Sequence, residues 1–474
     1  MYDTSQKYWD PRNECMSPGE LGILQERRLR QAVKQAYHQT IFYRRVFDEI
    51  GLKPEDIVTL EDAGKIPLID KYILRDLTTK ALEEGNRPFF ELAAVPEKEF
   101  ITIHTTSGTT GVPYTEPYTE PEFTIRGFIA SGDFSARGYW AFGLRPGDIM
   151  AHLWNLGGAM VGGGNHILGK GACGPELFLT LIPGHVGRTE EILKLLKAVK
   201  ATAIISTPSY SQYLPEAAAK MGMDVKRDLS IRVIVCAGEP GPASVPGLRD
   251  KLEGLWGAKA FDAYGAPGVM LAPECEERCG FHTTGENVYI QIVDPETKKE
   301  LPPGEMGSIV ATKLGNNSVP FLRFNTEDRG ALIMDPCPCG RTHPRISSVP
   351  GRWDDVIKVK GFRLYPDTVE KVAKETPGCT GQFVIILEKD DQGKDNVRIQ
   401  IEHEERIDDV TAFQKKIARL ITTLITLKAD VDVVPKGTIG GYVMKSQRVV
   451  DLRTEEARRK FEEGRKLRSA KYFD

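Results

Sequence analysis

The strongest constraint on the fold is an alternation of short apolar runs and helix-like segments in the middle of the chain. Strand-like runs at 201–205, 231–236 and 258–261 are separated by helix-like segments at about 210–221 and 245–255. Strands that alternate with helices in this way predict a parallel sheet with helices on both faces. The central part of the chain is therefore predicted to have an α/β fold.

Two smaller regions follow this predicted sheet. From residue 288 to about 334, short strands alternate with Gly and Pro turns, which indicates a β-rich subdomain. Near residue 351 the pattern changes to strands and two helices, typical of a compact α+β unit. We expect a large N-terminal α/β domain with several subdomains over 1–353 and a small, mobile α+β C-terminal domain over 354–474.

Composition limits the partners that the chain could bind. The 474 residues carry a net charge of −3 with dispersed Lys and Arg, which argues against a nucleic-acid partner held by bulk charge. No run of 18 apolar residues is present, and the first residues lack the apolar segment of a signal peptide. We expect a cytoplasmic protein that binds neither nucleic acid nor membrane, and a homodimer is one option for its assembly.

One loop is rich in hydroxyl groups and glycine. Residues 105–113 read Thr-Thr-Ser-Gly-Thr-Thr-Gly-Val-Pro and follow a strand-like run at 100–103. Glycine lets the backbone N–H groups approach an anion closely, and the hydroxyls add further donors. A plain polar turn is the alternative. The pattern favours a phosphate-binding loop formed by Ser107, Gly108, Thr109, Thr110 and Gly111.

Two other segments of the chain also stand out in the sequence. Residues 164–171 nearly match a Walker A loop, but Gly171 stands where Ser or Thr would bind Mg²⁺, so a P-loop NTPase is not expected. The tandem Pro-Tyr-Thr-Glu repeat at 113–120 is read as part of an extended loop. No G-x-G-x-x-G follows a predicted strand, which disfavours a Rossmann dehydrogenase.

Two motifs end neighbouring predicted strands. Ligands of an open parallel sheet bind at the carboxyl ends of the strands, so both motifs would face one ligand. Ordinary strand-to-helix turns are the alternative, and the order of the motifs favours a nucleotide. The candidate nucleotide-binding residues are Ala237, Gly238, Glu239 and Pro240 in the first motif and Asp262, Ala263, Tyr264 and Gly265 in the second.

The hydroxyl-rich loop and these two motifs, in this order, resemble the adenylate-forming acyl-CoA synthetases. From about residue 16 to 453 the chain is most similar to their phenylacetate-CoA ligase branch. The resemblance implies that Tyr264 stacks on adenine and that Asp328, in the segment Phe-Asn-Thr-Glu-Asp, binds the ribose hydroxyls. A carboxylate suits that task because it can accept two O–H donors.

Two segments near the C-terminus extend the resemblance. The string Gly-Arg-Trp-Asp-Asp at 351–355 is similar to the family's inter-domain hinge, which implies that Asp354 is the pivot and that Arg352 lies near the phosphate or ribose. The segment 444–451 is similar to the terminal segment with the catalytic lysine. Lys445 would offset charge on the carboxylate and α-phosphate, and Thr106 and Arg352 are the other catalytic candidates.

The resemblance implies a reaction in two steps. A carboxylate attacks the α-phosphate of Mg-ATP to give an acyl-adenylate and pyrophosphate. After the C-terminal domain rotates, the thiol of coenzyme A attacks the adenylate and releases AMP. The branch implies an aromatic or arylacetic acid, and aromatic side chains suit such a substrate. The candidates for the acid pocket are His152, Trp154, Asn155 and Tyr210.

Departures from the family pattern keep two alternatives open. Val112 replaces a usual Lys, and Gly268 replaces the Glu that helps to hold Mg²⁺, for which Glu239 or Glu274 could substitute. Two glycines and Tyr-Val-Met precede Lys445 where a Gly-Lys pair is usual. The chain could pass the acyl group to an amine or carrier-protein thiol, or it could bind nucleotide with weakened catalysis.

Cysteine and histidine cluster in two stretches of the second half of the chain. In a reducing compartment such clusters favour metal over disulfides, and four ligands of Cys₃His type would form a closed, structural Zn²⁺ site. Reduced, buried cysteines are the alternative. The candidate ligands are Cys275, Cys279, His282, Cys337 and Cys339.

Overall fold

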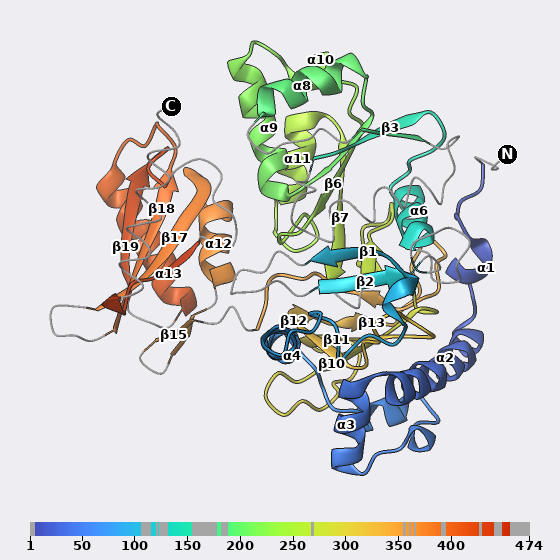
Figure 1. The fold of residues 1–474 in the computed structure, drawn as a ribbon. Coiled ribbons are helices and arrows are strands. Elements are labelled where there is room, and N and C mark those ends of the chain that lie inside the picture. The colour runs from blue at the N-terminus through green and yellow to red at the C-terminus, as the bar shows by residue number, and fades with distance from the viewer. Residues whose placement is uncertain are drawn as a thin grey trace. The chain divides into compact units, whose positions relative to one another are not determined.

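A computed structural model of the chain gives the architecture (Figure 1). The chain divides into two compact units, Met1–Pro350 and Gly351–Asp474. We predicted the boundary after residue 353, and the division of functions between the two domains stays a prediction. The structure describes residues 5–105, 115–119, 122, 131–153, 178–181, 188–266, 270–353, 357–359, 362–364, 366–389, 395–425, 429–439 and 448–455.

The first unit begins with a group of helices. The longest, α2 (Pro18–Gln39), starts at a capping box in which Ser17 and Glu20 satisfy each other's backbone N–H groups. Its buried face packs with the following helices around a core that includes Leu29, Phe47 and Phe321. The other helices of this region are α1 (Pro11–Glu14), α3 (Ile41–Ile50), η1 (Pro54–Asp56), η2 (Glu61–Lys65), α4 (Lys71–Glu83) and η3 (Glu97–Glu99).

A six-stranded sheet forms the centre of the first unit, with strand order β4-β3-β5-β6-β7-β8. The first five strands are parallel, and β8 pairs antiparallel with β7. The sequence pattern thus correctly predicted a parallel sheet. The strands are β3 (Asp148–His152), β4 (Phe178–Leu181), β5 (Ala203–Ser206), β6 (Val233–Ala237), β7 (Lys259–Ala266) and β8 (Met270–Pro273).

Helices cover both faces of this sheet. One face, through Ala151, Ile204 and Ile234, packs against the group of helices that carries the labels α8 to α11 in Figure 1. The other face, through Met150 and Val235, packs against α6. The covering helices are α6 (Ser131–Ala141), α8 (Thr189–Ala198), α9 (Pro208–Lys220), α10 (Val225–Asp228) and α11 (Leu248–Trp256).

Small antiparallel sheets complete the first unit, as the Gly- and Pro-rich pattern predicted. Two three-stranded sheets have the orders β10-β11-β12 and β13-β14-β9, and β1 pairs with β2 in a hairpin. The reading of residues 113–120 as a loop was wrong in part, because Thr115–Thr119 form β2. The strands are β1 (Phe100–Thr105), β2 (Thr115–Thr119), β9 (Phe281–His282), β10 (Val288–Val293), β11 (Gly307–Lys313), β12 (Phe324–Gly330), β13 (Leu332–Ile333) and β14 (Arg345–Ile346).

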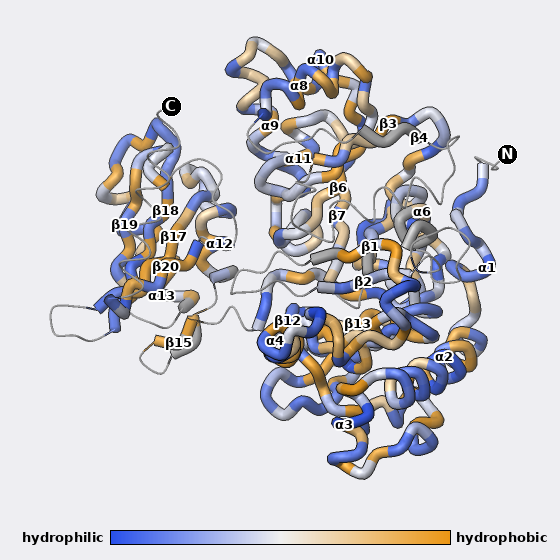
Figure 2. Tube along the Cα trace, viewed as in Figure 1, coloured by the Kyte–Doolittle hydropathy of each residue, from blue (hydrophilic) through white to orange (hydrophobic). Residues whose placement is uncertain are grey.

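The second unit is an α+β fold around a four-stranded sheet of order β19-β18-β17-β20. Along β18, polar and apolar residues alternate, and the tube in Figure 2 shows apolar residues concentrated in these strands. Their buried side chains pack with α12 and α13 in one core. The elements are β15 (Ile357–Val359), β16 (Phe362–Leu364), α12 (Pro366–Glu375), β17 (Cys379–Lys389), β18 (Asp395–His403), α13 (Val410–Ile425), β19 (Asp430–Pro435) and β20 (Val449–Asp451).

Within the described ranges, none of the helices combines the length and the hydropathy that crossing a bilayer requires.

Candidate functional site

Tyr264 and Asp328, which were predicted to bind the adenine and the ribose of a nucleotide, contact each other. Tyr264 is near the end of β7 and Asp328 is in β12, 64 positions along the chain. The Tyr264 hydroxyl donates to Asp328 Oδ2 at 2.7 Å and lies 3.4 Å from Thr326 Oγ1. The Tyr264 ring is buried and packs against Phe281, with ring centroids 6.1 Å apart. An aromatic face and a carboxylate are thereby held side by side.

The Gly-Glu-Pro motif forms the turn at the end of β6. Gly238 adopts a φ of +82°, in the left-handed region that glycine enters at no steric cost. Glu239 then accepts hydrogen bonds from the backbone N–H of Ser209, at 3.2 Å, and from its hydroxyl. Ser209 lies in the first turn of α9, so Glu239 ties the end of β6 to the start of this helix. The sequence pattern did not indicate Ser209.

Asp262 shapes the loop that follows this turn. Its carboxylate is buried and accepts hydrogen bonds from the backbone N–H groups of Ala243 and Ala263, both at 3.0 Å. A Cβ atom on Gly241 would lie 2.3 Å from this carboxylate, so only glycine fits there. Burial raises the pKa of Asp262 to about 8, against the lowering effect of these hydrogen bonds. The Asp262 side chain is therefore occupied in holding the loop.

Of the two acidic residues that could replace the missing Mg²⁺ ligand, Glu274 is already paired. It is fully buried, and both carboxylate oxygens accept from Arg249 Nη2, at 2.8 and 3.0 Å. One oxygen also accepts the backbone N–H of Asp262 at 2.7 Å. A buried carboxylate engaged in this way stabilises the end of the sheet, and Glu239 is likewise engaged by Ser209.

Two candidates for the acid pocket lie at the same edge of the sheet. His152 is the last residue of β3, and Tyr210 lies in the helix that follows β5, the strand paired with β3. Burial lowers the pKa of His152 to about 4, so its imidazole is neutral near pH 7. The Tyr210 hydroxyl lies 3.2 Å from Thr189 Oγ1. A neutral ring and a phenol suit an uncharged, aromatic part of a substrate.

Several predicted site residues fall on parts of the chain that the structure leaves undescribed. Arg352 is described and is half-buried in the second unit. The strands on either side of the hydroxyl-rich loop are also described, and Thr105 pairs with Thr115, so the loop is closed by the β1–β2 ladder. The residues outside the described ranges are Thr106, Ser107, Gly108, Thr109, Thr110, Gly111, Val112, Trp154, Asn155, Gly268, Asp354 and Lys445.

The β1–β2 hairpin is fastened by buried charges that the sequence did not reveal. Glu116 of β2 forms an ion pair with Lys313, the last residue of β11, and both side chains are buried. Glu122 accepts hydrogen bonds from the backbone N–H groups of Thr119 and Ser318, at 2.9 and 2.8 Å. These contacts connect the strand after the hydroxyl-rich loop to the three-stranded sheet that carries Asp328.

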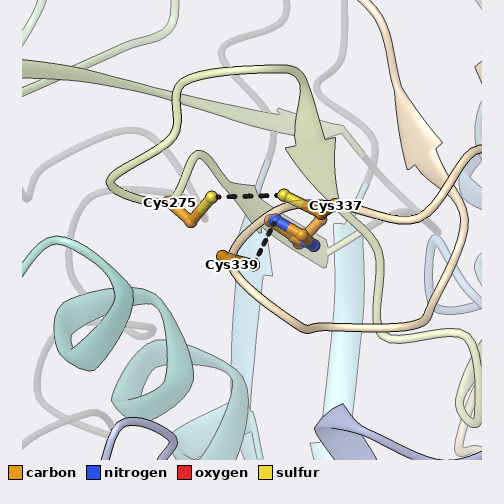
Figure 3. Close-up of side chains that lie close together, drawn as sticks. Cys275, Cys337 and Cys339 are labelled. Atoms are coloured by element: carbon orange, nitrogen blue, oxygen red, sulfur yellow. Dashed lines mark hydrogen bonds between the residues drawn. The ribbon is translucent and has the colours of Figure 1, made fainter.

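Four of the five predicted metal ligands converge. The ligand atoms of Cys275, His282, Cys337 and Cys339 all lie within 4.8 Å of one another, and all four residues are buried. Figure 3 shows Cys337 and Cys339 on one loop and Cys275 facing Cys337 from another. The two Sγ atoms of Cys275 and Cys337 are 3.7 Å apart, and Cys339 Sγ is 3.6 Å from His282 Nε2.

These separations match the edges of a zinc tetrahedron. With Zn–S bonds of about 2.3 Å and Zn–N bonds of about 2.0–2.1 Å, two sulfurs lie about 3.8 Å apart and a sulfur and a nitrogen about 3.6 Å apart. Burial also lowers the pKa of His282, which keeps the imidazole neutral as a ligand requires. The residues present therefore fit a closed Cys₃His site.

The N-terminal segment packs against the loop that carries two of these ligands. The Tyr8 hydroxyl donates to the Cys339 carbonyl oxygen at 2.8 Å. Arg341 donates its backbone N–H to Cys339 Sγ, at 3.4 Å, and its Nε to Glu14 Oε2, at 2.6 Å. The Cys-Pro-Cys-Gly loop thus links the N-terminus to the end of the central sheet, where Cys275 lies.

Comparison with protein families gives two matches. Residues 23–316 match the family model described as AMP-binding enzyme. Residues 361–453 match the model described as AMP-binding enzyme C-terminal domain. The first match covers more than half of the chain, and the second lies within the second compact unit.

Similar proteins and structures include ligases that form coenzyme A thioesters. The chain is 32% identical to the phenylacetate-coenzyme A ligase of Thermus thermophilus over 94% of this chain and 99% of that protein. It is 25% identical to a crystal structure of 2-hydroxyisobutyryl-CoA ligase in the postadenylation state, with a TM-score of 0.83 over 99% of this chain and 96% of the other. A structure of that ligase in the thioesterification state matches with a TM-score of 0.68 and 26% identity over the same shares.

Proposed function

This chain belongs to the AMP-binding enzyme family, in its phenylacetate-CoA ligase-like branch, and we propose that it is an AMP-forming ligase that joins an arylacetic acid to coenzyme A. The family and the enzyme class predicted from the sequence agree with these relatives. The observation that carries the proposal for this chain is the contact between Tyr264 and Asp328. Under this proposal the Tyr264 ring would stack on adenine and the Asp328 carboxylate would bind the ribose hydroxyls, near the carboxyl end of β7.

In the first step the acid carboxylate attacks the α-phosphate of ATP. The hydroxyl-rich loop at 107–111, closed by the β1–β2 ladder, would hold the phosphates with backbone N–H and hydroxyl donors. Thr106, Arg352 and Lys445 would offset the charge that develops as pyrophosphate leaves. Mg²⁺ would accompany ATP, and we propose Glu239 as a substitute for the acidic ligand that Gly268 replaces.

In the second step the thiol of coenzyme A attacks the acyl-adenylate and AMP leaves. We propose that the second unit presents a different face for this step by rotating at Asp354, since one site must serve two reactions. The two described states of 2-hydroxyisobutyryl-CoA ligase, postadenylation and thioesterification, support this proposal.

The acid pocket is proposed to lie beside His152 and Tyr210. Because its pKa is about 4, the His152 imidazole carries no charge at neutral pH. It would therefore not form an ion pair that holds the substrate carboxylate away from the α-phosphate of ATP. An aryl ring could pack against these side chains while the carboxylate points towards the phosphates. Trp154 and Asn155 are proposed to complete the pocket.

We also propose a structural Zn²⁺ bound by Cys275, His282, Cys337 and Cys339. With four protein ligands the site is closed, so the metal would stabilise the fold and take no part in the reaction. The proposed setting is the cytoplasm, where ATP and coenzyme A are available and thiols stay reduced.

A panel of aromatic acids tests the proposal. Purified protein is incubated with ATP, Mg²⁺ and each acid, and pyrophosphate release is measured with and without coenzyme A. Phenylacetate or a close relative should give AMP in the presence of coenzyme A. If an amine or a carrier-protein thiol, but not coenzyme A, accelerates AMP release, the alternative acceptor is correct. No pyrophosphate with any acid would favour a nucleotide-binding relative without turnover.

Lys445→Ala separates the two half-reactions. It should reduce adenylate formation by on the order of 10²–10³, the usual cost of removing one group that stabilises developing charge. Thioester formation from a supplied acyl-adenylate should change far less. Lys436→Ala, which removes a partly exposed lysine of the same unit, is the control. Equal losses in both half-reactions would contradict the role of Lys445.

A further inference from the structure

A fifth cysteine lies beside the proposed metal centre but outside its four ligands. Cys279 Sγ is 3.4 Å from Cys337 Sγ. Among the described residues, the cluster of ligand atoms within 4.8 Å of one another contains Cys337 and does not contain Cys279. Cys279 is partly exposed, whereas the four clustered residues are buried. Cys279 is therefore the most exposed residue of the five.

Arg345 holds the Cys279 sulfur in place. Its Nη1 donates to Cys279 Sγ at 2.9 Å and also to the Cys279 carbonyl oxygen. Arg345 is itself buried and is fixed at its other nitrogen by the Asp335 carbonyl oxygen, at 2.8 Å. A partly exposed cysteine whose sulfur contacts a guanidinium is in the kind of environment in which cysteines are oxidised selectively.

We propose that Cys279 is an oxidation site and that its reaction with a peroxide leads to a disulfide with Cys337, which releases the metal. The proposal rests on the zinc part of the proposed function. A disulfide needs its sulfurs about 2.05 Å apart, so the pair must approach by about 1.4 Å. Both residues lie in loops, Cys279 between β8 and β9 and Cys337 between β13 and β14, where side-chain rotation can provide this movement.

The reaction has two steps. The Cys279 sulfur attacks one oxygen of the peroxide, the O–O bond breaks, and the departing oxygen leaves as water or an alcohol after taking up a proton. Cys279 is thereby oxidised to a sulfenic acid and the peroxide is reduced. The Cys337 thiolate then attacks the Cys279 sulfur, the S–S bond forms, and the S–O bond breaks to release hydroxide, which takes up a proton to give water.

Formation of this disulfide removes one ligand from the proposed metal centre. Three ligands would remain, and a structural zinc site needs four. The loop of Cys337 and Cys339, which connects to Tyr8 and Glu14, would lose the stabilisation that a bound metal provides. Oxidation should therefore lower the thermal stability of the first unit and be reversed by a dithiol reductant together with zinc.

The test follows zinc and disulfides in the same samples. Protein purified without added metal is analysed for zinc and then treated with hydrogen peroxide in the presence of pyridylazoresorcinol, a chromogenic zinc chelator. Zinc release should keep pace with a Cys279–Cys337 disulfide detected by peptide mapping. Cys279→Ser and Cys279→Ala should both slow release by about tenfold or more, because the remaining sulfurs are buried. Cys379→Ser, which removes a partly exposed thiol of the second unit, should release zinc at the wild-type rate.

Two results would overturn the proposal. One is zinc release at the wild-type rate from both Cys279 variants, and the other is a disulfide between a different pair of cysteines. A protein with no zinc before peroxide treatment would contradict the zinc proposal instead. Peptide mapping would then still decide whether Cys279 and Cys337 form a disulfide.

Discussion

Replacing Lys313 by methionine tests whether the hairpin that frames the hydroxyl-rich loop depends on its buried ion pair. Glu116 is 1% exposed and Lys313 is 6% exposed, so both charges have lost nearly all their water. Removing one partner of a buried pair costs about 3–5 kcal/mol because the other charge stays buried and uncompensated. Lys313→Met should lower the free energy of unfolding by an amount in this range.

Glu116→Gln should cost less, about 1–3 kcal/mol, since the amide oxygen can still accept a hydrogen bond from Lys313. The ammonium group would also keep its place over the rings of Phe321 and Tyr118, 4.8 and 5.7 Å from their centroids. The double variant should be more stable than Lys313→Met, because no unpaired charge remains buried.

The pH dependence gives an independent check. Burial raises the pKa of Glu116 even with Lys313 beside it, and loss of Lys313 should raise it further. A carboxyl whose pKa is higher in the folded state contributes stability that is complete below its unfolded pKa and is lost as pH rises through the folded pKa. Lys313→Met should therefore regain stability as the pH falls from about 7 towards 5, and the double variant should not.

Urea unfolding at both pH values, followed by tryptophan fluorescence, measures these differences. Tryptophan reports mainly on the first unit, which contains Trp9, Trp140, Trp154 and Trp256, whereas the second contains Trp353. The steady-state KM for ATP should rise in Lys313→Met if the hairpin positions the phosphate loop. A coupling energy below about 0.5 kcal/mol between the two positions would refute the reasoning, since that is the limit expected of independent sites.

Three further predictions concern the site. Because burial lowers the pKa of His152 from 6.5 to about 4, its contribution to stability is present above pH 6.5 and lost as pH falls through the folded pKa. Between pH 6.5 and pH 4, the free energy of unfolding of wild type, measured by thermal unfolding, should fall by up to about 3 kcal/mol more than that of His152→Gln. Elemental analysis should find one zinc ion per chain in wild type, and Cys337→Ser should lose this zinc and have lower thermal stability. Wild-type protein without metal would contradict the site. Asp354→Pro, which fixes the backbone angle φ, should leave adenylation measurable and slow thioester formation sharply. Wild-type rates in both half-reactions would place the pivot elsewhere.

The central sheet could be predicted because its strands are buried on both faces. Apolar runs bounded by turn residues correctly located β5, β6 and β7 to within a few residues. The end of β7 was placed too early, since Asp262 to Gly265 were read as a turn. Asp262 stays in the strand because it pairs with β6, and Ala263 to Gly265 stay in it because they pair with β8; local composition does not record such pairings.

The β1–β2 hairpin shows where the sequence pattern fails. Strand β2 contains Pro117 and Glu116, and both residue types are depleted in strands. Proline is tolerated there because β2 lies at the edge of a two-stranded sheet, and the charge is tolerated because Lys313 pairs with it. The sequence pattern also missed Ser209, because its partner Glu239 comes from a different strand–helix turn. Contacts of this kind depend on packing between distant segments, which periodicity does not encode.

The parallel sheet explains why several of the short motifs lie at one edge of the first unit, while their roles stay predictions. Each parallel strand ends at the same edge, so His152, Tyr210 and Glu239 gather there whatever their distance along the chain. The contact of Tyr264 with Asp328 has a different origin, because Asp328 belongs to the antiparallel sheet. Its position relative to Tyr264 is set by the shared core of the two sheets, in which Tyr264 packs with strands β10 and β11. The residues proposed to bind adenosine therefore depend on packing between sheets, and those proposed to bind the acid depend on the edge of one sheet.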